Sequence, residues 1–440
     1  MTIYAISTPP GKSAIAVIRI SGAAASAALR ALTHGALPKA RQAALRILYH
    51  PATHAAIDSA LVLRFDAPNS FTGEDMIELQ THGSRAVLQL MLEALAAIPE
   101  LRPAEPGEFS RRAFLNGKMD LTEAEGLADL IDAETRQQQQ LAMRQMQGEL
   151  HILYEGWRWQ LVQIMACLEA YIDFPDEPLP DTLEAQIMQV AGQLLLQMQL
   201  HLNDNLRGQR LREGALIVIL GAPNAGKSSF LNYISRKEVA IVSPLAGTTR
   251  DALEVHLDIG GFPVTLVDTA GLRQSTDQIE QEGVRRSYQK AGDAELVLAL
   301  IDGETYPDIP TEIAPYKDKA IIIMTKSDLY PLKTKADSNA FFISSVTGEG
   351  IATLMEHLKN RLAELMLPGN MPTITRTRHR QQIEQAAAGL SEFLKFGNNR
   401  PIELRAENMR HTAQKIGTLT GKIDLEEVLD ALFSTFCIGK

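Results

Sequence analysis

The sequence predicts an α/β + α protein: an N-terminal α+β domain, a helical domain in two separate pieces, and an α/β domain inserted between those pieces. Short apolar runs alternate with helical periodicity in residues 1–116 and again in residues 214–369. Residues 117–213 and 370–440 repeat apolar positions every three or four residues, which gives each segment one apolar helix face. Such a face must pack on another element, so we expect the two helical segments to share a core. The length of 440 residues agrees with three domains of about 150 residues each.

Composition and charge exclude several classes of protein. The formal net charge is −10, the opposite sign from a protein that coats nucleic acid non-specifically. The two cysteines, Cys167 and Cys437, cannot build a disulfide framework or a four-thiolate zinc site. The longest apolar stretches are too short to span a bilayer, and the N-terminal apolar run is broken by Arg19 and lacks the basic region of a signal peptide. We therefore expect a cytoplasmic protein with no membrane partner.

The elements of the N-terminal domain are predicted by short alternating runs. Residues 14–20, 60–65 and 76–80 have the composition of strands. The apolar positions that follow Ser84 predict a helix that this serine caps and that ends before Pro99.

Longer periodic stretches follow in the helical segments. Thr122 and Glu125 have the spacing of a capping box, so we expect a helix to start there. An apolar stripe at steps of three and four residues over 146–172 is typical of one long helix. The same periodicity continues over 183–212 and returns over 376–440.

The inserted domain opens with a phosphate-binding motif. The strand predicted at Ala215–Leu220 leads into GAPNAGKS at 221–228, which matches GxxxxGK[ST]. In this pattern the loop amides and the next helix hold phosphate, the lysine reaches the outer phosphates, and the serine binds Mg²⁺. Residues 243–249 should form the first switch, with Thr249 on Mg²⁺ when nucleotide is bound. The expected phosphate-site residues are Asn224, Ala225, Gly226, Lys227, Ser228 and Ser229.

Three further motifs each follow a predicted strand. They are Asp268-Thr269-Ala270-Gly271 after 264–267, Thr325-Lys326-Ser327-Asp328 after 320–324, and Ser344-Ser345-Val346 after 341–343. Asp268 would lie near Mg²⁺ and the amide of Gly271 near the γ-phosphate. Asp328 can accept hydrogen bonds from guanine N1–H and the exocyclic amine, donors that adenine lacks at those places. The serine motif suits a backbone contact to guanine O6. Together the motifs predict a GTPase.

Two departures from the usual pattern bear on the mechanism. The base motif usually begins with Asn, and Thr325 can replace only part of the bonding of that amide, so we expect modest nucleotide affinity with guanine selectivity retained. Leu272 stands where Ras-like enzymes place a glutamine that orients the attacking water. Hydrolysis must therefore recruit another group. Arg273, Glu280 and Glu282 are candidates, although a residue of this kind, taken singly, is more often a solvated loop charge.

Several residues outside the inserted domain are candidates for a second site. Arg19 lies in a strand with apolar residues on both faces, so it needs an anionic partner, either a structural salt bridge or a ligand carboxylate. Glu78 lies on a predicted strand and Lys118 at a turn. Charged side chains in such places are most often solvated. Cys437 follows an apolar run, where a cysteine is usually a small core residue. Its alternative role is that of a thiolate activated by a cation such as Lys440.

Eight short motifs are spread over the whole chain: PPG at 9–11, RISG at 19–22, NSFTGED at 69–75, RPAEPGEF at 102–109, AFLN at 113–116, DFPD at 173–176, GTTRD at 247–251 and FCIGK at 436–440. Together they resemble the MnmE (TrmE) family of tRNA-modification GTPases. The C-terminal motif is highly specific. For the fold, the resemblance implies an N-terminal domain similar to folate-dependent aminomethyltransferases and an inserted Ras-like P-loop GTPase domain.

The resemblance also implies the sites and partners. The N-terminal domain would form a homodimer and bind a tetrahydrofolate one-carbon donor through the positions that match the family motif, Arg19, Glu78, Lys118 and Lys440. Cys437 would lie near the reacting carbon as nucleophile or acid–base group.

For the GTPase domain, the family implies that K⁺ replaces the charge of an arginine finger. Asn224 and the backbone carbonyls of Ser243, Leu245 and Thr248 would hold it, and Glu280 would orient water indirectly. With an FAD-dependent MnmG-type subunit, in a heterotetramer, the protein would add a carboxymethylaminomethyl or aminomethyl group to carbon 5 of the wobble uridine, U34, of certain tRNAs.

Two other functions remain open from the residues alone. A ribosome-assembly GTPase would share the GTP motifs but would need an RNA-binding module such as a KH domain, and no GXXG loop in a basic context is found. A nucleotide-gated scaffold without chemistry of its own would explain the long helices, but it would leave Arg19, Glu78 and Cys437 as coincidences.

Overall fold

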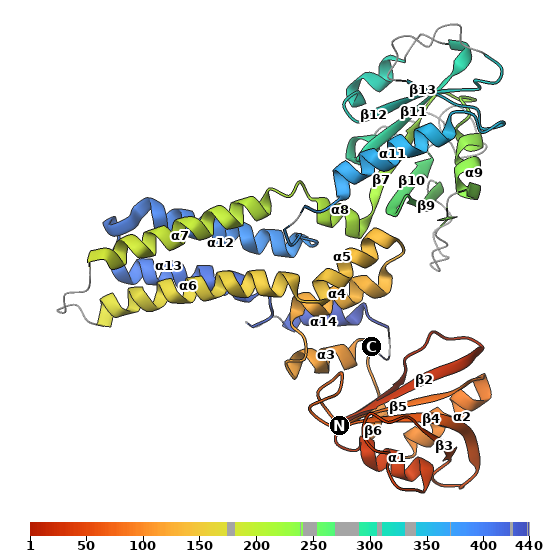
Figure 1. Cartoon of the computed structure of the whole chain (residues 1–440), viewed down its shortest axis with the longest axis vertical. Helices are drawn as coiled ribbons and strands as arrows, with labels where there is room; N and C mark the ends of the chain where they lie inside the picture. Colours follow the sequence, from red (N-terminus) through yellow and green to blue (C-terminus); the bar gives the residue numbers. More distant parts are fainter. Residues whose placement is uncertain are drawn as a thin grey trace. The chain divides into compact units, whose positions relative to one another are not determined.

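The computed structural model describes residues 1–173, 181–237, 239–240, 253–268, 290–305, 310–330, 340–369, 371–422, 426–437 and 439. The chain divides into two compact units (Figure 1). The first unit is Met1–Ala128, Met146–Glu155 and Ile416–Lys440, and the second is Asp129–Gln145 and Gly156–Lys415. Within the described residues, no helix is long and apolar enough to cross a membrane.

The first unit is built on a six-stranded sheet with the order β3-β4-β5-β2-β1-β6. All neighbouring strands are antiparallel except β1 and β6. The strands are β1 (Thr2–Ile6), β2 (Ser13–Ser21), β3 (Ala44–Tyr49), β4 (Ala56–Phe65), β5 (Met76–Gly83) and β6 (Leu101–Pro103). The strands predicted at 14–20, 60–65 and 76–80 are therefore confirmed as the middle of β2, the second half of β4 and the first part of β5.

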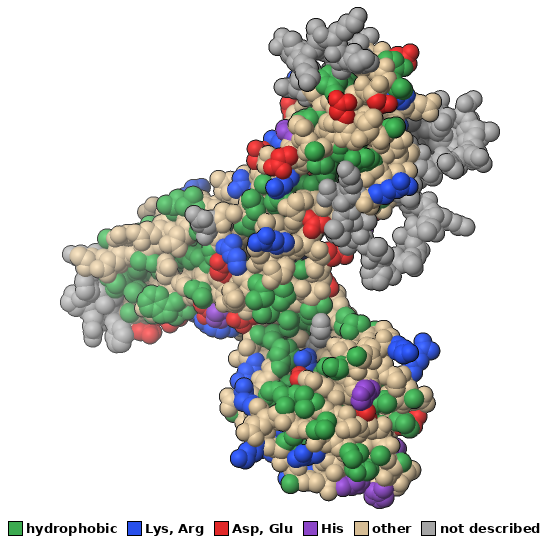
Figure 2. All heavy atoms as spheres, turned by 45° about the vertical axis from the view of Figure 1, so that its right-hand side comes forward, with side chains coloured by type: hydrophobic (Ala, Val, Ile, Leu, Met, Phe, Trp, Pro, Cys, Tyr) green, Lys and Arg blue, Asp and Glu red, His purple; other side chains and the backbone are tan. Residues whose placement is uncertain are grey.

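Two helices, α1 (Ala25–Thr33) and α2 (Arg85–Ala96), bury their apolar residues against one face of this sheet. The predicted cap of α2 is confirmed, because the Ser84 hydroxyl accepts a hydrogen bond from the amide of Val87 at 3.2 Å. The apolar side chains of Ile15, Leu45 and Ile47 are 58%, 67% and 49% exposed. Figure 2 likewise shows apolar side chains at the surface of this unit.

The capping box predicted at Thr122 and Glu125 is wrong by two residues. Helix α4 (Leu121–Asp132) is capped by Asp120, whose carboxylate accepts from the amide of Glu123 at 2.7 Å, while the Glu123 carboxylate accepts from the amide of Asp120 at 2.8 Å. Thr122 and Glu125 are buried instead. Both pairs have the spacing of the motif, and burial decides between them.

The remaining helices of the first unit are α3 (Glu108–Leu115) and α14 (Glu426–Ser434), and the unit also includes the first turns of α6. The long helix predicted over 146–172 is divided: α5 (Arg136–Met146) ends and α6 (Glu149–Asp173) begins on either side of Gly148, which has a φ of 84°. A left-handed glycine ends a helix even where the apolar period continues through it.

In the second unit, α6 packs with α7 (Asp181–Leu202), α12 (Thr377–Phe396) and α13 (Ile402–Gly417) in a bundle (Figure 1). Trp157 of α6 donates to Gln197 of α7 at 3.0 Å, and an ion pair joins Arg405 of α13 to Glu184 of α7. Helices from both predicted segments therefore share one core, which confirms the discontinuous helical domain.

The helix predicted over 183–212 is interrupted where Asn205 and Leu206 take positive φ, and α8 (Arg207–Glu213) follows. Short 3₁₀ turns complete the second unit: η1 (Gly303–Thr305), η2 (Thr311–Tyr316) and η3 (Gly397–Asn399).

The second unit also contains a seven-stranded sheet with the order β13-β12-β11-β7-β10-β9-β8. Its strands are β7 (Ala215–Leu220), β8 (Val239–Ala240), β9 (Leu253–Ile259), β10 (Phe262–Asp268), β11 (Leu296–Asp302), β12 (Ala320–Thr325) and β13 (Ala340–Phe342). All neighbouring pairs are parallel except β10–β9 and β9–β8, because β9 alone runs opposite to the other strands of the sheet.

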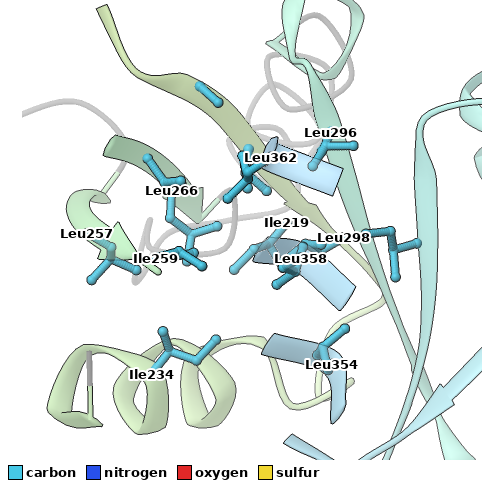
Figure 3. Close-up of a cluster of buried hydrophobic side chains, with 14 of the residues drawn as sticks. Ile219, Ile234, Leu257, Ile259, Leu266, Leu296, Leu298, Leu354, Leu358 and Leu362 are labelled. Atoms are coloured by element: carbon cyan, nitrogen blue, oxygen red, sulfur yellow. The ribbon is translucent and has the colours of Figure 1, made fainter. Parts of the chain in front are cut away.

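Helices α9 (Lys227–Lys237) and α11 (Ile351–Met366) pack on this sheet around a core that includes Ile219, Leu298 and Leu358 (Figure 3). Leu141 of α5 and Leu211 of α8 join the same core. This is the architecture of a Ras-like P-loop domain. Its central strand, β7, lies between β10 and β11, and the phosphate loop follows β7.

Candidate functional site

The phosphate loop lies at the carboxyl edge of the parallel strands. It begins where β7 ends, and α9 begins at Lys227. A Cβ on Gly221 would lie 2.3 Å from the carbonyl oxygen of Leu300, so only glycine fits against β11 there. Asn224 and Gly226 have φ of 63° and 84°. Left-handed residues at these points turn successive amides toward one concavity, which is suited to an anion.

Lys227 lies within this loop rather than on the surface. Its side chain is buried, and Nζ donates to the carbonyl oxygens of Gly221 at 2.7 Å and Ala222 at 2.8 Å. These contacts hold the ammonium group at the concave side of the loop, within reach of the position of the outer phosphates. Ala225 is buried beneath the loop, and Ser228 and Ser229 are exposed on the first turn of α9.

Thr325 links the base-recognition loop to the phosphate loop. Its buried hydroxyl lies 2.9 Å from the carbonyl oxygen of Ala225 and 3.2 Å from that of Ile301. A hydroxyl has one proton, so it can donate to only one of these acceptors at a time, whereas an amide could donate to two. The modest nucleotide affinity expected from this residue stays a prediction.

An ion pair fixes the residue that follows Thr325. Lys326 has a φ of 59° and its ammonium lies 2.5 Å from the carboxylate of Asp302, at the end of β11. The hydrogen bond that Lys326 donates to Asp302 raises the pKa of Lys326. Burial alone would raise the pKa of Asp302, but the bonds from Lys326 and the Glu304 amide outweigh it and lower that pKa. The pair holds the loop so that Asp328 is left exposed at the nucleotide edge.

The serine motif forms a tight turn beside this loop. The Ser344 hydroxyl accepts from the amides of Val346 at 3.2 Å and Thr347 at 3.1 Å, and Ile343 accepts at its carbonyl from the amide of Ser327 at 3.1 Å. Val346 is 84% exposed. The two loops predicted to recognise the base therefore meet at the ends of the neighbouring strands β12 and β13.

Several predicted residues lie outside the described residues: Ser243, Leu245, Thr248, Thr249, Thr269, Ala270, Gly271, Leu272, Arg273, Glu280, Glu282 and Lys440. Of Asp268, the backbone is described as the last residue of β10. Within the part of the chain that is described, no three His, Cys, Asp or Glu side chains form a metal-binding cluster.

In the first unit, Arg19 and Glu78 are cross-strand neighbours on β2 and β5. Arg19 Nε lies 2.9 Å from Glu78 Oε1, and the side chains are 26% and 18% exposed. The guanidinium also lies 5.8 Å from the ring centroid of Phe71. Of the two anionic partners considered for Arg19, the structure provides the salt bridge, and both groups remain accessible to a ligand.

Lys118 lies beside Gly73, which is in the loop that also contains Phe71. Lys118 is exposed, and a Cβ on Gly73 would lie 3.1 Å from its Cε. Asn116 donates to the carbonyl oxygen of Thr72 at 2.7 Å and so fixes the turn that carries the lysine.

The C-terminal tail docks on the first unit. Phe433 of α14 packs against Phe114 of α3 with ring centroids 6.5 Å apart, and the Ser7 hydroxyl donates to the carbonyl oxygen of Gly439 at 2.9 Å. Cys437 is exposed, so the expectation of a core cysteine is wrong. The thiol is held out of the core because Phe433 and Phe436 occupy the buried positions of this segment.

Sequence reasoning missed a charge network beside the tail. Glu108 of α3 accepts from Arg102 at 2.6 Å and from Arg112 at 2.9 Å, and Arg112 also pairs with Glu74 at 3.0 Å. Burial would raise the pKa of Glu108, but these bonds and the Glu105 amide lower it overall. A cavity of about 620 Å³ adjoins this network and α14. The alternating charges of residues 102–112 were the only available signal.

Family models match nearly the whole chain. The model described as GTP-binding protein TrmE N-terminus matches residues 2–118, and that of the MnmE helical domain matches residues 121–437.

Full-length relatives agree with these models. The tRNA modification GTPase MnmE of Paramagnetospirillum magneticum is 48% identical over 443 residues, covering 100% of this chain and 99% of the relative. That of Parvibaculum lavamentivorans is 48% identical over 442 residues and covers 100% of both. A mitochondrial protein of Danio rerio named 5-taurinomethyluridine-[tRNA] synthase subunit GTPB3 is 43% identical, covering 100% of this chain and 93% of that protein.

The matches cover the phosphate loop, the guanine-recognition loops and the N-terminal sheet together. They set aside the ribosome-assembly and scaffold alternatives, and they imply a hydrolase that binds GTP and Mg²⁺. The chain belongs to the MnmE family of tRNA modification GTPases.

Proposed function

We propose that this protein is a K⁺-activated GTPase that works with an FAD-dependent, MnmG-type subunit to modify carbon 5 of the wobble uridine, U34, of certain tRNAs. The added group would be carboxymethylaminomethyl or aminomethyl, with its one-carbon unit drawn from a tetrahydrofolate. The observation that best supports this is the contact of the C-terminal tail, through Gly439 and Ser7, with the sheet that carries the Arg19–Glu78 pair. The proposed location of this activity is the cytoplasm.

The comparisons support the chemistry and the partner. The name of the zebrafish relative specifies a uridine that carries its group at carbon 5, and calls that protein a subunit. A homodimer through the N-terminal unit is supported by the uncovered apolar side chains of Ile15, Leu45 and Ile47. Leu45 and Ile47 lie on β3, one of the two edge strands of the sheet.

In the GTPase domain, the residues present suit their proposed roles. Ser228, exposed on the first turn of α9, would bind Mg²⁺ together with Thr249. Lys227 would move from its carbonyl partners to the phosphates, and Asp328 would bind guanine. K⁺ would be held by the side chain of Asn224 and by the carbonyls of Ser243, Leu245 and Thr248.

Hydrolysis would then depend on groups outside the phosphate loop. Glu280 would orient water indirectly, because Leu272 cannot. Arg273 is the alternative source of positive charge.

Replacing K⁺ by Na⁺ is expected to slow GTP hydrolysis by on the order of tenfold to a hundredfold while GTP binding barely changes, because the stabilising charge acts only on the transition state. Turnover and nucleotide affinity in matched chloride salts measure this. Asn224→Gly is the matched variant, since glycine tolerates the left-handed φ of 63° and removes only the side chain. This variant should reduce the difference in GTP turnover between the K⁺ and the Na⁺ salt. Equal rates for the unchanged protein would remove K⁺ from the mechanism and point to Arg273.

The folate site would use the Arg19–Glu78 pair. A guanidinium suits a carboxylate or ring carbonyl of a folate, and a carboxylate suits the adjacent N–H groups of the pterin ring. Lys118 and Lys440 would complete the site. Cys437, which is exposed beside the docked tail, would be available as nucleophile or acid–base group.

Glu78→Ala in the full-length protein should weaken binding of a stable reduced folate by roughly tenfold to a hundredfold, the value of a lost charge-assisted hydrogen bond of about 1.5–3 kcal/mol. Calorimetry measures the affinity. Glu93→Ala, on the exposed surface of α2, is the control and should bind as the unchanged protein does. Tight binding by Glu78→Ala, with only a lower melting temperature, would show that the ion pair is structural.

A further inference from the structure

The chain crosses between the helical bundle and the seven-stranded sheet twice, and the two crossings touch. The incoming crossing is α8, which leads directly into β7, and the outgoing one follows α11 and leads into α12. A Cβ on Gly208 of α8 would lie 2.4 Å from the carbonyl oxygen of Ile374. The two crossings are therefore packed backbone to backbone, and a shift of one must move the other.

One carboxylate joins both crossings. Asp129, near the end of α4, accepts at Oδ1 from Arg212 Nε of the incoming crossing at 3.1 Å and from Arg376 Nη2 of the outgoing one at 2.8 Å. The three side chains are 15%, 29% and 16% exposed. Arg212 also donates to the carbonyl oxygen of Thr375 at 3.5 Å. Charge-assisted bonds at such partly buried positions hold geometry more strictly than surface pairs do.

Helix α5 also forms a hydrogen bond to each of the two crossings. Gln138 donates to the carbonyl oxygen of Arg212 at 3.0 Å, and the buried Gln145 donates to the Thr375 hydroxyl at 2.7 Å. These side chains line a cavity of about 190 Å³ together with Asp129. A small space beside the bonded groups leaves them room to rearrange.

The same helix contacts the sheet at the end opposite the nucleotide edge. The amide of Gln137 donates to the carbonyl oxygen of Gly261 at 3.2 Å, in the turn between β9 and β10. Leu141 packs in the core of the sheet. Strand β10 runs from this turn to Asp268, so a single strand links the α5 contact to the nucleotide edge.

We infer that Asp129 is a positioning residue whose bonds to Arg212 and Arg376 fix the GTPase domain on the helical bundle, so that changes at the nucleotide edge reach the helices. The alternative is that this network only stabilises the fold. The two differ in what happens when the charge is removed without loss of shape: a coupling element loosens the arrangement of the two parts, whereas a purely structural pair lowers stability and leaves the arrangement of the folded protein unchanged.

The test uses the full-length protein with Cys167 and Cys437 replaced by serine and spin labels at exposed positions 189 of α7 and 360 of α11. Asp129→Asn is nearly isosteric and removes the charge. Asp132→Asn, exposed one turn further along α4 and lining the same cavity, is the matched control. Distance distributions are recorded with GDP and with a non-hydrolysable GTP analogue, alongside GTP turnover and melting temperature.

Asp129→Asn should widen the distance distribution between the two labels on the order of twofold and remove its dependence on nucleotide, as loss of a two-state contact would. Basal GTP turnover should stay within about twofold, because the residue is remote from the phosphate loop. Asp132→Asn should match the unchanged protein. If Asp129→Asn does not fold, Arg376→Gln removes the outgoing bond alone and should give the same widening. Unchanged distributions in the folded variant would overturn the inference, whatever its melting temperature.

Discussion

Asp328→Asn is expected to weaken GTP binding by roughly 2–4 kcal/mol, or about 30- to 1,000-fold in Kd, and to favour xanthosine triphosphate. The substitution removes one charge-assisted hydrogen bond that the carboxylate accepts from guanine. The NH₂ group of the new amide then faces an N–H group of guanine, so two donors oppose each other. Xanthine has a carbonyl where guanine has its exocyclic amine, so it pairs with that donor. Competition binding with the two nucleotides measures the change.

Glu349→Gln provides the control for Asp328→Asn. Glu349 is exposed in the loop after β13, near the other base-recognition turn, and the substitution changes charge by the same amount. It should leave the preference for GTP in place. A variant of Asp328 that still prefers GTP as strongly as the unchanged protein would remove this residue from the guanine site.

Gly107→Ala is expected to detach the C-terminal helix from the first unit. Gly107 has a φ of 66°, and a Cβ there would lie 2.3 Å from the carbonyl oxygen of Phe433, a contact no side chain can make. The left-handed backbone costs an alanine about 1–2 kcal/mol, and overpacking against α14 adds about 1–3 kcal/mol. Hydrogen exchange over residues 426–437 should therefore accelerate by on the order of tenfold to a hundredfold, since α14 opens more often.

Gly117→Ala separates the clash from the backbone strain. Gly117 has a φ of 65°, and nothing lies within 4 Å of its Cβ position. This variant carries the same strain and should leave exchange of α14 unchanged. Under our proposal, Gly107→Ala should also lose folate binding while GTP hydrolysis continues, because the tail no longer reaches Ser7. Equal exchange in the two glycine variants would show that α14 is held by other contacts.

The elements that could be predicted from the sequence are those that local chemistry dictates. Strand β7 has its predicted bounds because an apolar run is followed at once by a loop that phosphate binding requires. The capping of α4 could not be decided, since Asp120 and Thr122 both stand three residues before a glutamate. Only the burial of Thr122 in the folded unit selects Asp120.

Features that depend on contacts between residues distant in sequence could not be predicted from the sequence. The Arg19–Glu78 pair requires the register between β2 and β5, which neither strand specifies alone. The exposure of Cys437 depends on where α14 docks, and the partnership of Lys326 with Asp302 depends on the order of β11 and β12 in the sheet. The Asp129 network likewise joins residues that are far apart in the chain.

The measurement that tests the account most directly is mass analysis of tRNA nucleosides from a strain that lacks this protein, before and after it is restored. We expect the carbon-5 aminomethyl-type modifications of wobble uridine to disappear in the deletion strain. They should return with the unchanged chain but not with Glu78→Ala or Gly107→Ala, while Gly117→Ala restores them. An unchanged content of these modified uridines in the deletion strain would contradict the proposed function.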